Sequence, residues 1–403
     1  MTFYLKECKR ILFSLTFVLY TIALAAMFIS QVRPGIETIN KPVKGQESYG
    51  WTTKDDPDLI MPAAVQSLYD EYKQNDYRAY PMGFLKYVKL DDEERAQIGQ
   101  ILSELTGIPK SSLAGDGLPE NTQVAVAKGL SYDRFKELMN EADGIIGGGS
   151  SYGKSYLVSS FGMAQKDYDT ALKEYDQIVN EDHITGAMAR LFSDYMGIML
   201  GILPVFVATA LILKDRRSGV RPLIYTRKFS TIRIVGTRYL AMLTMLVLPV
   251  LALGAYETVI LVGMNPNAQL DLLAFPKYIL GWLLPTVMTV SALGLLLTEL
   301  TDTPVAIAVQ MLWWFLCVNM GLRQMGGGYE GLPLFPRHNS SANTQIFRDS
   351  FGTLAFNRVF YAVLALALVV LSMLVYEMKR KGKLRGYAGI REIFRNRKNK
   401  HQA

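Results

Sequence analysis

One stretch of the chain has the spacing of a phosphate-binding loop. Residues 148–155, GGSSYGKS, fit the pattern G-x-x-x-x-G-K-S, in which backbone N–H groups and a lysine hold the phosphates of a nucleotide. That chemistry requires the loop to follow a buried strand and to open a helix. The preceding residues 131–144 have the pattern of a helix, and no convincing hydrophobic strand ends in an aspartate for magnesium. We therefore predict a flexible Gly/Ser connection between two helices here.

A few polar and aromatic residues lie within long apolar runs. Glu257, in LALGAYETVILVG, is an ionisable group at membrane depth and is therefore a functional candidate, unless it lies near an interface or pairs with a polar neighbour. Trp313 and Trp314 lie in the middle of an apolar run; packing against helices or a dimer partner competes with stacking on a substrate. We take these three residues as candidates for a substrate path. Arg190 and Asp194 are interpreted as interfacial.

The composition excludes an ordinary soluble domain and divides the charge unevenly. Half of the 403 residues are hydrophobic, and the mean hydropathy is +0.15. Residues 31–187 carry 16 Lys or Arg and 25 Asp or Glu, whereas the net charge of the whole chain is +7. The rest of the chain is therefore strongly basic, and its basic residues adjoin apolar runs, which argues against a nucleic-acid partner. The three histidines are scattered and predict no metal site.

The apolar runs predict six transmembrane helices. They are residues 11–30, 195–213, 239–264, 278–297, 304–320 and 354–376, each near the length needed to cross a bilayer. A cleaved signal peptide is an alternative for the first run, since Ala23-Leu24-Ala25 resembles a cleavage site. We expect retention, because the apolar run continues past that site.

The basic residues predict the orientation of these helices. If the N-terminus lies in the cytoplasm, six membrane crossings return the C-terminus to the cytoplasm. The loop 214–238, with eight Lys or Arg and one acid, and the tail 378–403, with ten Lys or Arg, are then both cytoplasmic. Residues 31–187 become an extracytoplasmic domain between the first two spans.

The predicted outer domain is mainly helical. Residues 91–107 begin with acids and end at Gly107, with one apolar face. Ser131 is the predicted cap of a second helix, and a third begins near Tyr168. Short strands, and so an α+β domain, are an alternative in 31–62 and 118–130.

The loop 214–238 contains helix-breaking and apolar residues among its basic residues. Gly219 and Pro222 interrupt any continuous helix, and four apolar side chains lie among the basic residues: Leu223, Ile224, Tyr225 and Phe229. Binding of lipid headgroups needs the charges but not this apolar insert. We therefore predict a surface that docks into a groove on another cytoplasmic protein.

The chain resembles ABC-2-type transporter permeases. The resemblance lies in the span order, in the charged segment and Gly219 after the second span, in the apolar insert before residues 226–240, and in the last span and tail, 336–382. It implies that the loop carries a coupling helix that contacts a separately encoded ATPase. The resemblance implies that the ATPase-coupling residues of this chain are Asp215, Arg216, Arg217, Gly219, Leu223, Ile224, Tyr225 and Phe229.

The resemblance further implies a bacterial exporter subunit in the cytoplasmic membrane, working with a second permease copy or a homologous permease. The chain itself would be no enzyme and would bind no cofactor, with ATP and magnesium on the partner. Two other classes remain open: a membrane-anchored sensor or receptor for an extracellular peptide, and an ion-coupled transporter. An ion-coupled transporter is expected to have several charged or broken-helix positions at mid-membrane, and of the residues considered only Glu257 qualifies.

Overall fold

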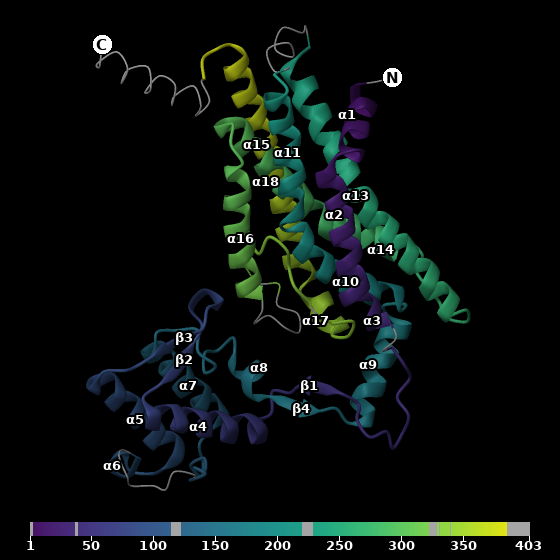
Figure 1. Ribbon diagram of the computed structural model, residues 1–403. Helices are drawn as coiled ribbons and strands as arrows, with labels where there is room; N and C mark the ends of the chain where they lie inside the picture. Colours follow the sequence, from purple (N-terminus) through teal and green to yellow (C-terminus); the bar gives the residue numbers. More distant parts are fainter. Residues whose placement is uncertain are drawn as a thin grey trace, which may run out of the picture. The chain divides into compact units, whose positions relative to one another are not determined.

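The computed structural model describes residues 3–36, 39–113, 122–219, 229–321, 329, 331–338 and 340–384. The chain divides into two compact units (Figure 1). The helical unit comprises Met1–Lys41, Glu174–Val318 and Gln324–Ala403, and the second unit comprises Pro42–Lys173 with Asn319–Arg323. The second unit is shorter than the predicted outer domain, because Ile178 and Ile184 pack into the core of the helical unit.

The helical unit contains no described strand. Its elements, in chain order, are α1 (Phe3–Leu12), α2 (Leu15–Met27), the π-helical turn η1 (Phe28–Val32), α3 (Arg33–Ile36), α9 (Tyr168–Asn180, which begins in the second unit), α10 (Thr185–Leu200), α11 (Leu203–Arg217), α13 (Thr231–Met264), α14 (Ala274–Tyr278), the π-helical turn η4 (Ile279–Leu283), α15 (Leu284–Thr301), α16 (Val305–Gly321), α17 (Thr344–Asp349) and α18 (Phe351–Arg380).

Several of these helices can cross a membrane, so the chain is an α-helical membrane protein. Among the described residues, four helical segments are long and apolar enough: Leu15–Val32, Thr231–Met264, Ala274–Thr301 and Phe351–Arg380. Helices α10 and α11 are long and apolar enough to cross a membrane only if the two, bent by 41°, form one span. Helix α16, at 17 residues, is about 25 Å long and somewhat short of a hydrocarbon core of about 30 Å.

Two predicted spans are interrupted in the structure. Ser14 separates α1 from α2; its hydroxyl donates to the Ile11 carbonyl and accepts from the Phe17 N–H. The predicted span 195–213 is wrong as a single helix, since α10 ends at Leu200 and α11 begins at Leu203. Pro204 has no N–H to give to the carbonyl four residues earlier, and its ring crowds that carbonyl.

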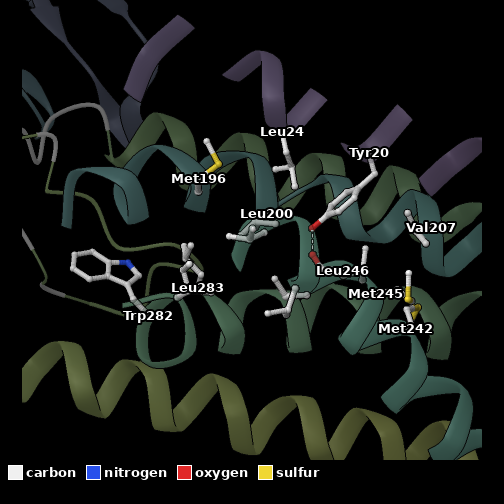
Figure 2. Close-up of a cluster of buried hydrophobic side chains, with 14 of the residues drawn as sticks. Tyr20, Leu24, Met196, Leu200, Val207, Met242, Met245, Leu246, Trp282 and Leu283 are labelled. Carbon is white, nitrogen blue, oxygen red and sulfur yellow. Dashed lines mark hydrogen bonds between the residues drawn. The ribbon is translucent and has the colours of Figure 1, made fainter. Parts of the chain in front are cut away.

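The core of the helical unit joins residues that are far apart in the sequence. Figure 2 shows Tyr20 and Leu24 of α2 packed with Leu200 and Leu246 from α10 and α13. The Tyr20 hydroxyl donates to the Leu246 carbonyl over 2.6 Å, so its buried polar atom is satisfied. The first apolar helix is therefore integrated into the core; Leu24 is fully buried.

The second unit is mainly helical, with two small antiparallel sheets. Strands β1 (Trp51–Thr53) and β4 (Met163–Gln165) pair with each other, as do β2 (Tyr77–Ala79) and β3 (Lys86–Val88). The helices are α4 (Pro57–Gln74), α5 (Asp92–Thr106), α6 (Lys110–Leu113), α7 (Tyr132–Ile146) and α8 (Leu157–Phe161). Apolar faces of α4, α5 and α7 form its core, which includes Leu68, Leu102 and Phe135.

Local capping signals explain why the predicted helices of this unit form. Asp91 and Glu94 make a capping box at the start of α5, and Gly107 ends that helix in a left-handed conformation. Ser131 caps α7 by accepting from the Arg134 N–H. These predicted helices are confirmed, and so is the one beginning at Tyr168. The alternative of short strands is confirmed in residues 31–62 by β1; residues 122–130, the described part of 118–130, contain no strand.

Candidate functional site

A buried ion-pair cluster joins three helices at one end of the helical unit. Asp215, near the end of α11, pairs with Arg10 of α1 at 2.6 Å and with Arg238 of α13 at 2.7 Å. Glu7 of α1 lies 3.4 Å from both arginines. The side chains of Glu7, Asp215 and Arg238 are nearly buried. Two carboxylates and two guanidinium groups balance each other, so the cluster holds the three helix ends together without a net charge.

Further contacts at the same end attach α15 and α18 to the flanks of the basic loop. Lys379 of α18 pairs with Asp302, just after α15, at 3.0 Å. Arg380 donates to the carbonyl of Phe229 over 3.0 Å, and Thr231 donates to Glu377. On the other flank, Arg216 donates to the Asp302 carbonyl. Figure 1 shows α1, the end of α11, the start of α13 and the end of α18 at this one end of the unit.

The predicted coupling residues divide into a buried and an exposed group. Asp215 is buried and paired with Arg10 in the ion-pair cluster. Arg217 and Gly219 are exposed, and Gly219 has a φ of +66°, which favours glycine. Phe229 is 40% exposed, with the Arg233 guanidinium 5.2 Å from its ring centre. The other three apolar residues lie outside the described residues: Leu223, Ile224 and Tyr225.

The opposite end of the helical unit contains a second buried polar cluster. Arg190 and Asp194, which are predicted to be interfacial, lie at this end, and both are fully buried within the protein. Arg190 donates to Asp182 over 2.7 Å and to the Ser341 carbonyl over 2.9 Å. Asp194 accepts from Arg337 over 2.9 Å. This cluster fastens α10 to the segment between α16 and α18, since an unpaired charge in such a position is strongly unfavourable.

His338 occupies the centre of that second cluster as a neutral imidazole. Its Nε2 donates to the Ala342 carbonyl over 2.9 Å, so its Nδ1 accepts from the Tyr329 hydroxyl at 2.6 Å. Burial, with the nearby positive charge of Arg190, lowers the pKa of His338 to about 4. Protonation would remove the acceptor for Tyr329 and place a second cation beside Arg190.

We predict that acidification destabilises the protein through His338. Its pKa is about 4 when folded and about 6.5 when unfolded, so the unfolded state binds the proton more readily. The stabilisation is complete above pH 6.5 and is lost as the pH falls towards 4, about 2 kcal/mol being lost at pH 5. Thermal unfolding in detergent at pH 7 and at pH 5 measures this loss of stability. His338→Gln should show a smaller drop than wild type; an equal drop would contradict this role.

Arg358 of α18 is a further buried cation, within the predicted span 354–376. It donates to the carbonyls of Trp282, Pro333 and Leu334 at 3.1–3.2 Å and to the Thr286 hydroxyl over 2.9 Å. Trp282 lies in the π-helical turn η4. Several oxygen acceptors thus solvate the guanidinium inside the protein, which connects α18 with α14–α15 and with the segment after α16.

Glu257 is placed differently from every other buried acid described above. Its side chain is fully buried in α13, and neither carboxylate oxygen has a hydrogen-bond partner among the described residues. The Arg33 guanidinium interacts electrostatically with Glu257, so the alternative of pairing with a polar neighbour stays open. An ionisable group that is fully buried in an apolar helix is costly, so Glu257 stays a functional candidate.

The two tryptophans of the predicted substrate path contact neighbouring helices. The Trp314 Nε1–H donates to the Ile198 carbonyl over 2.7 Å, and the Trp313 ring lies 6.2 Å from that of Tyr361. Gln310 donates to the Gly201 carbonyl over 2.6 Å. Side chains of α16 thus satisfy carbonyls freed at the break between α10 and α11, which is how a broken helix is tolerated at membrane depth.

The Gly/Ser stretch of the second unit does not have the geometry of a phosphate-binding loop. It follows helix α7 rather than a strand, and α8 after it has only 5 residues. The Asp143 carboxylate accepts from both the N–H and the hydroxyl of Ser150 at 2.6 Å. A carboxylate therefore occupies donors that phosphate would need. The prediction of a helix before this stretch is confirmed, and Lys154 is exposed.

Comparisons with known proteins leave the family of this chain open. The chain matches no protein-family model, no curated protein and no solved structure. Within the described residues, no group of three or more His, Cys, Asp or Glu is arranged to hold a metal ion. The function must therefore be argued from the two polar clusters, the buried Glu257 and the basic loop.

Proposed function

We propose that this chain is the membrane-spanning permease subunit of an ATP-driven ABC exporter. In this proposal it has six transmembrane helices and an extracytoplasmic domain at residues 31–187, and a separate ATPase subunit binds and hydrolyses ATP with magnesium. The observation that carries the proposal is the attachment of the basic loop 214–238. Asp215 and Arg238, near its two ends, are paired with each other and with α1.

The same contacts supply a mechanical route from the loop to the bundle. A force on the loop acts on α11 and α13 directly. It reaches α1 through Arg10, and α15 and α18 through Arg216, Asp302 and Lys379. Buried ion pairs of this kind break only at a high free-energy cost, so the helix ends move together. Two permeases and two ATPases would form the working unit, and closure of the ATPases would push on both loops. The chain itself performs no hydrolysis.

The proposed topology has both termini in the bacterial cytoplasm. It is supported by the position of three basic segments at one end of the helical unit: α1, the flanks of the loop, and the end of α18 (Figure 1). The second span would then be the bent pair α10 and α11, and the fifth would be the short helix α16.

Cysteine labelling tests this topology. Ser218→Cys and Gly386→Cys should resist a membrane-impermeant thiol reagent in intact cells, whereas Ser112→Cys should react. The reason is that the bilayer separates the reagent from the cytoplasmic face. All three should react after permeabilisation, which serves as the control for accessibility. Labelling of Ser218→Cys in intact cells would overturn the six-span arrangement.

The partner of the chain separates an exporter from a sensor. An exporter subunit purified from its own membranes in mild detergent should bring a nucleotide-binding subunit with it, and the complex should hydrolyse ATP. A sensor would bring a kinase or no partner. Mass spectrometry of the recovered proteins, together with ATP hydrolysis by the eluate, makes the distinction. Recovery of a kinase in place of an ATPase would reject the exporter.

An ion-coupled transporter remains the second candidate because of Glu257. Its buried carboxyl without hydrogen-bond partners among the described residues, together with the broken helix near Gly201, has the features expected of such transporters. However, Gln310 and Trp314 already occupy two carbonyls at the break. Uptake driven in proteoliposomes by a proton or sodium gradient alone, and abolished by Glu257→Gln, would favour this candidate.

A further inference from the structure

A cavity opens beside the ion-pair cluster, and none of the roles above uses it. Its volume is about 650 Å³, and it is enclosed by the break between α1 and α2, by α11 and by the start of α16. Arg10 lines it on one side, Lys214 and Arg217 line it on another, and Ile307 comes from α16. The cavity therefore lies at the end of the helical unit where the basic flanks gather.

The lining has an excess of positive charge. No aspartate or glutamate is among the described residues that line the cavity. Arg10 is balanced by Asp215 and Glu7, but the charged groups of Lys214 and Arg217 have no hydrogen-bond or ion-pair partner within the described part of the chain. Both side chains are exposed. Two cations are thus available at the mouth of the cavity to an anionic group.

The rest of the lining is mostly apolar. Along α11 it passes from Lys214 through Leu211 to Phe206, a distance of about 12 Å that fits within one leaflet of a hydrocarbon core about 30 Å thick. Phe13 and Leu15, which also line the cavity, are 74% and 73% exposed at the helix break. Such apolar exposure is favourable where hydrocarbon rather than water surrounds the chain.

We propose that this cavity binds an anionic phospholipid of the surrounding membrane. The phosphate would lie at Lys214 and Arg217, and one acyl chain would follow the wall formed by Leu211, Val207 and Phe206. A free anion has no use for the apolar wall, and an uncharged apolar ligand has no use for the two cations. Basic pockets between transmembrane helices are typical sites for acidic lipid headgroups. This inference requires only the membrane location and goes beyond the exporter proposal.

Lipid retention by the full-length chain tests the site. The protein in a neutral detergent would be mixed with phosphatidylglycerol or phosphatidylcholine and bound lipid counted by native mass spectrometry. Wild type should retain phosphatidylglycerol preferentially. The double variant Lys214→Gln/Arg217→Gln should bind it about thirtyfold more weakly, since each basic group contributes about a factor of five. The matched control Lys6→Gln/Lys9→Gln removes two exposed charges from α1 outside the cavity and should retain the lipid.

A filling variant tests the apolar wall independently of the charges. Ala210 also lines the cavity, and Ala210→Phe should reduce retention of phosphatidylglycerol while both cations remain. Equal retention of the two lipids by wild type, equal loss in the control and the Lys214/Arg217 variant, or displacement by millimolar inorganic phosphate would each overturn the proposal. Retention of neither lipid by wild type would likewise overturn it.

Discussion

Replacing Asp215 by alanine should destabilise the helical unit by about 3–5 kcal/mol, the range found when one partner of a buried ion pair is removed. Arg10 and Arg238 would be left with only Glu7, which lies 3.4 Å from each of them. The Arg238 side chain is nearly buried, so water cannot replace the lost partner. Thermal unfolding in detergent and the amount of protein in the membrane measure the effect.

An exposed ion pair in the same unit provides the control. Glu181 and Arg348 lie 2.6 Å apart, and their side chains are 36% and 48% exposed. Glu181→Ala should lose about 1 kcal/mol or less, because exposed pairs are screened by water. If Asp215→Ala unfolds at the same temperature as Glu181→Ala, the cluster does not hold the helix ends together.

Local signals made part of the fold predictable from the sequence. The helix that starts after Asp91 and ends at Gly107 has its cap, its acidic first turn and its terminating glycine within one short stretch. The same holds for the helix capped by Ser131. Apolar length likewise indicated membrane helices. By contrast, β1 and β4 pair residues that are more than a hundred positions apart, as Thr52 with Ala164, and nothing local encodes that contact.

The breaks in the apolar helices are harder to predict from the sequence. Hydropathy reports how apolar a run is but not whether its backbone is continuous, so the separation of α10 from α11 was missed. The signal was Pro204, with Gly201 before it. A side chain at Gly201 would also meet the ring of Phe335 at 2.6 Å, a requirement that no sequence pattern displays.

The two buried polar clusters are also hard to predict from the sequence, because they depend on tertiary packing. Asp215 was recognised as the one acid of the basic loop, but its partners Arg10 and Arg238 depend on how three helices pack. The burial of Arg190 and Asp194 has no local signal, because Ser341 and Arg337, which bond to them, come from a segment about 150 residues later. Arg358 could have been noticed, since it lies inside the predicted span 354–376 and a charge there calls for buried acceptors.

Truncating Tyr225 or Ile224 to alanine should weaken binding of the ATPase about thirtyfold and abolish transport, because an anchor in a well-packed interface contributes about 2 kcal/mol or more. The permease should remain inserted and folded, since the buried cluster that holds its helix ends is formed by other residues, Arg10, Asp215 and Arg238 among them. Arg217→Ala should have a smaller effect that decreases with added salt, as expected for a charge at the rim of an interface. Transport and ATPase recovery at two salt concentrations distinguish the two kinds of contact.

The most direct measurement is recovery of the ATPase with a variant in which Leu223, Ile224, Tyr225 and Phe229 are all replaced by alanine. Each permease is purified in detergent, and the bound ATPase is normalised to the permease present in the membrane. Charge reversal at Arg391 in the tail serves as the control and should change recovery little. The proposed docking loop predicts that the quadruple variant is present in the membrane but recovers almost no ATPase. Recovery equal to wild type would contradict docking and leave the loop only a signal for membrane orientation.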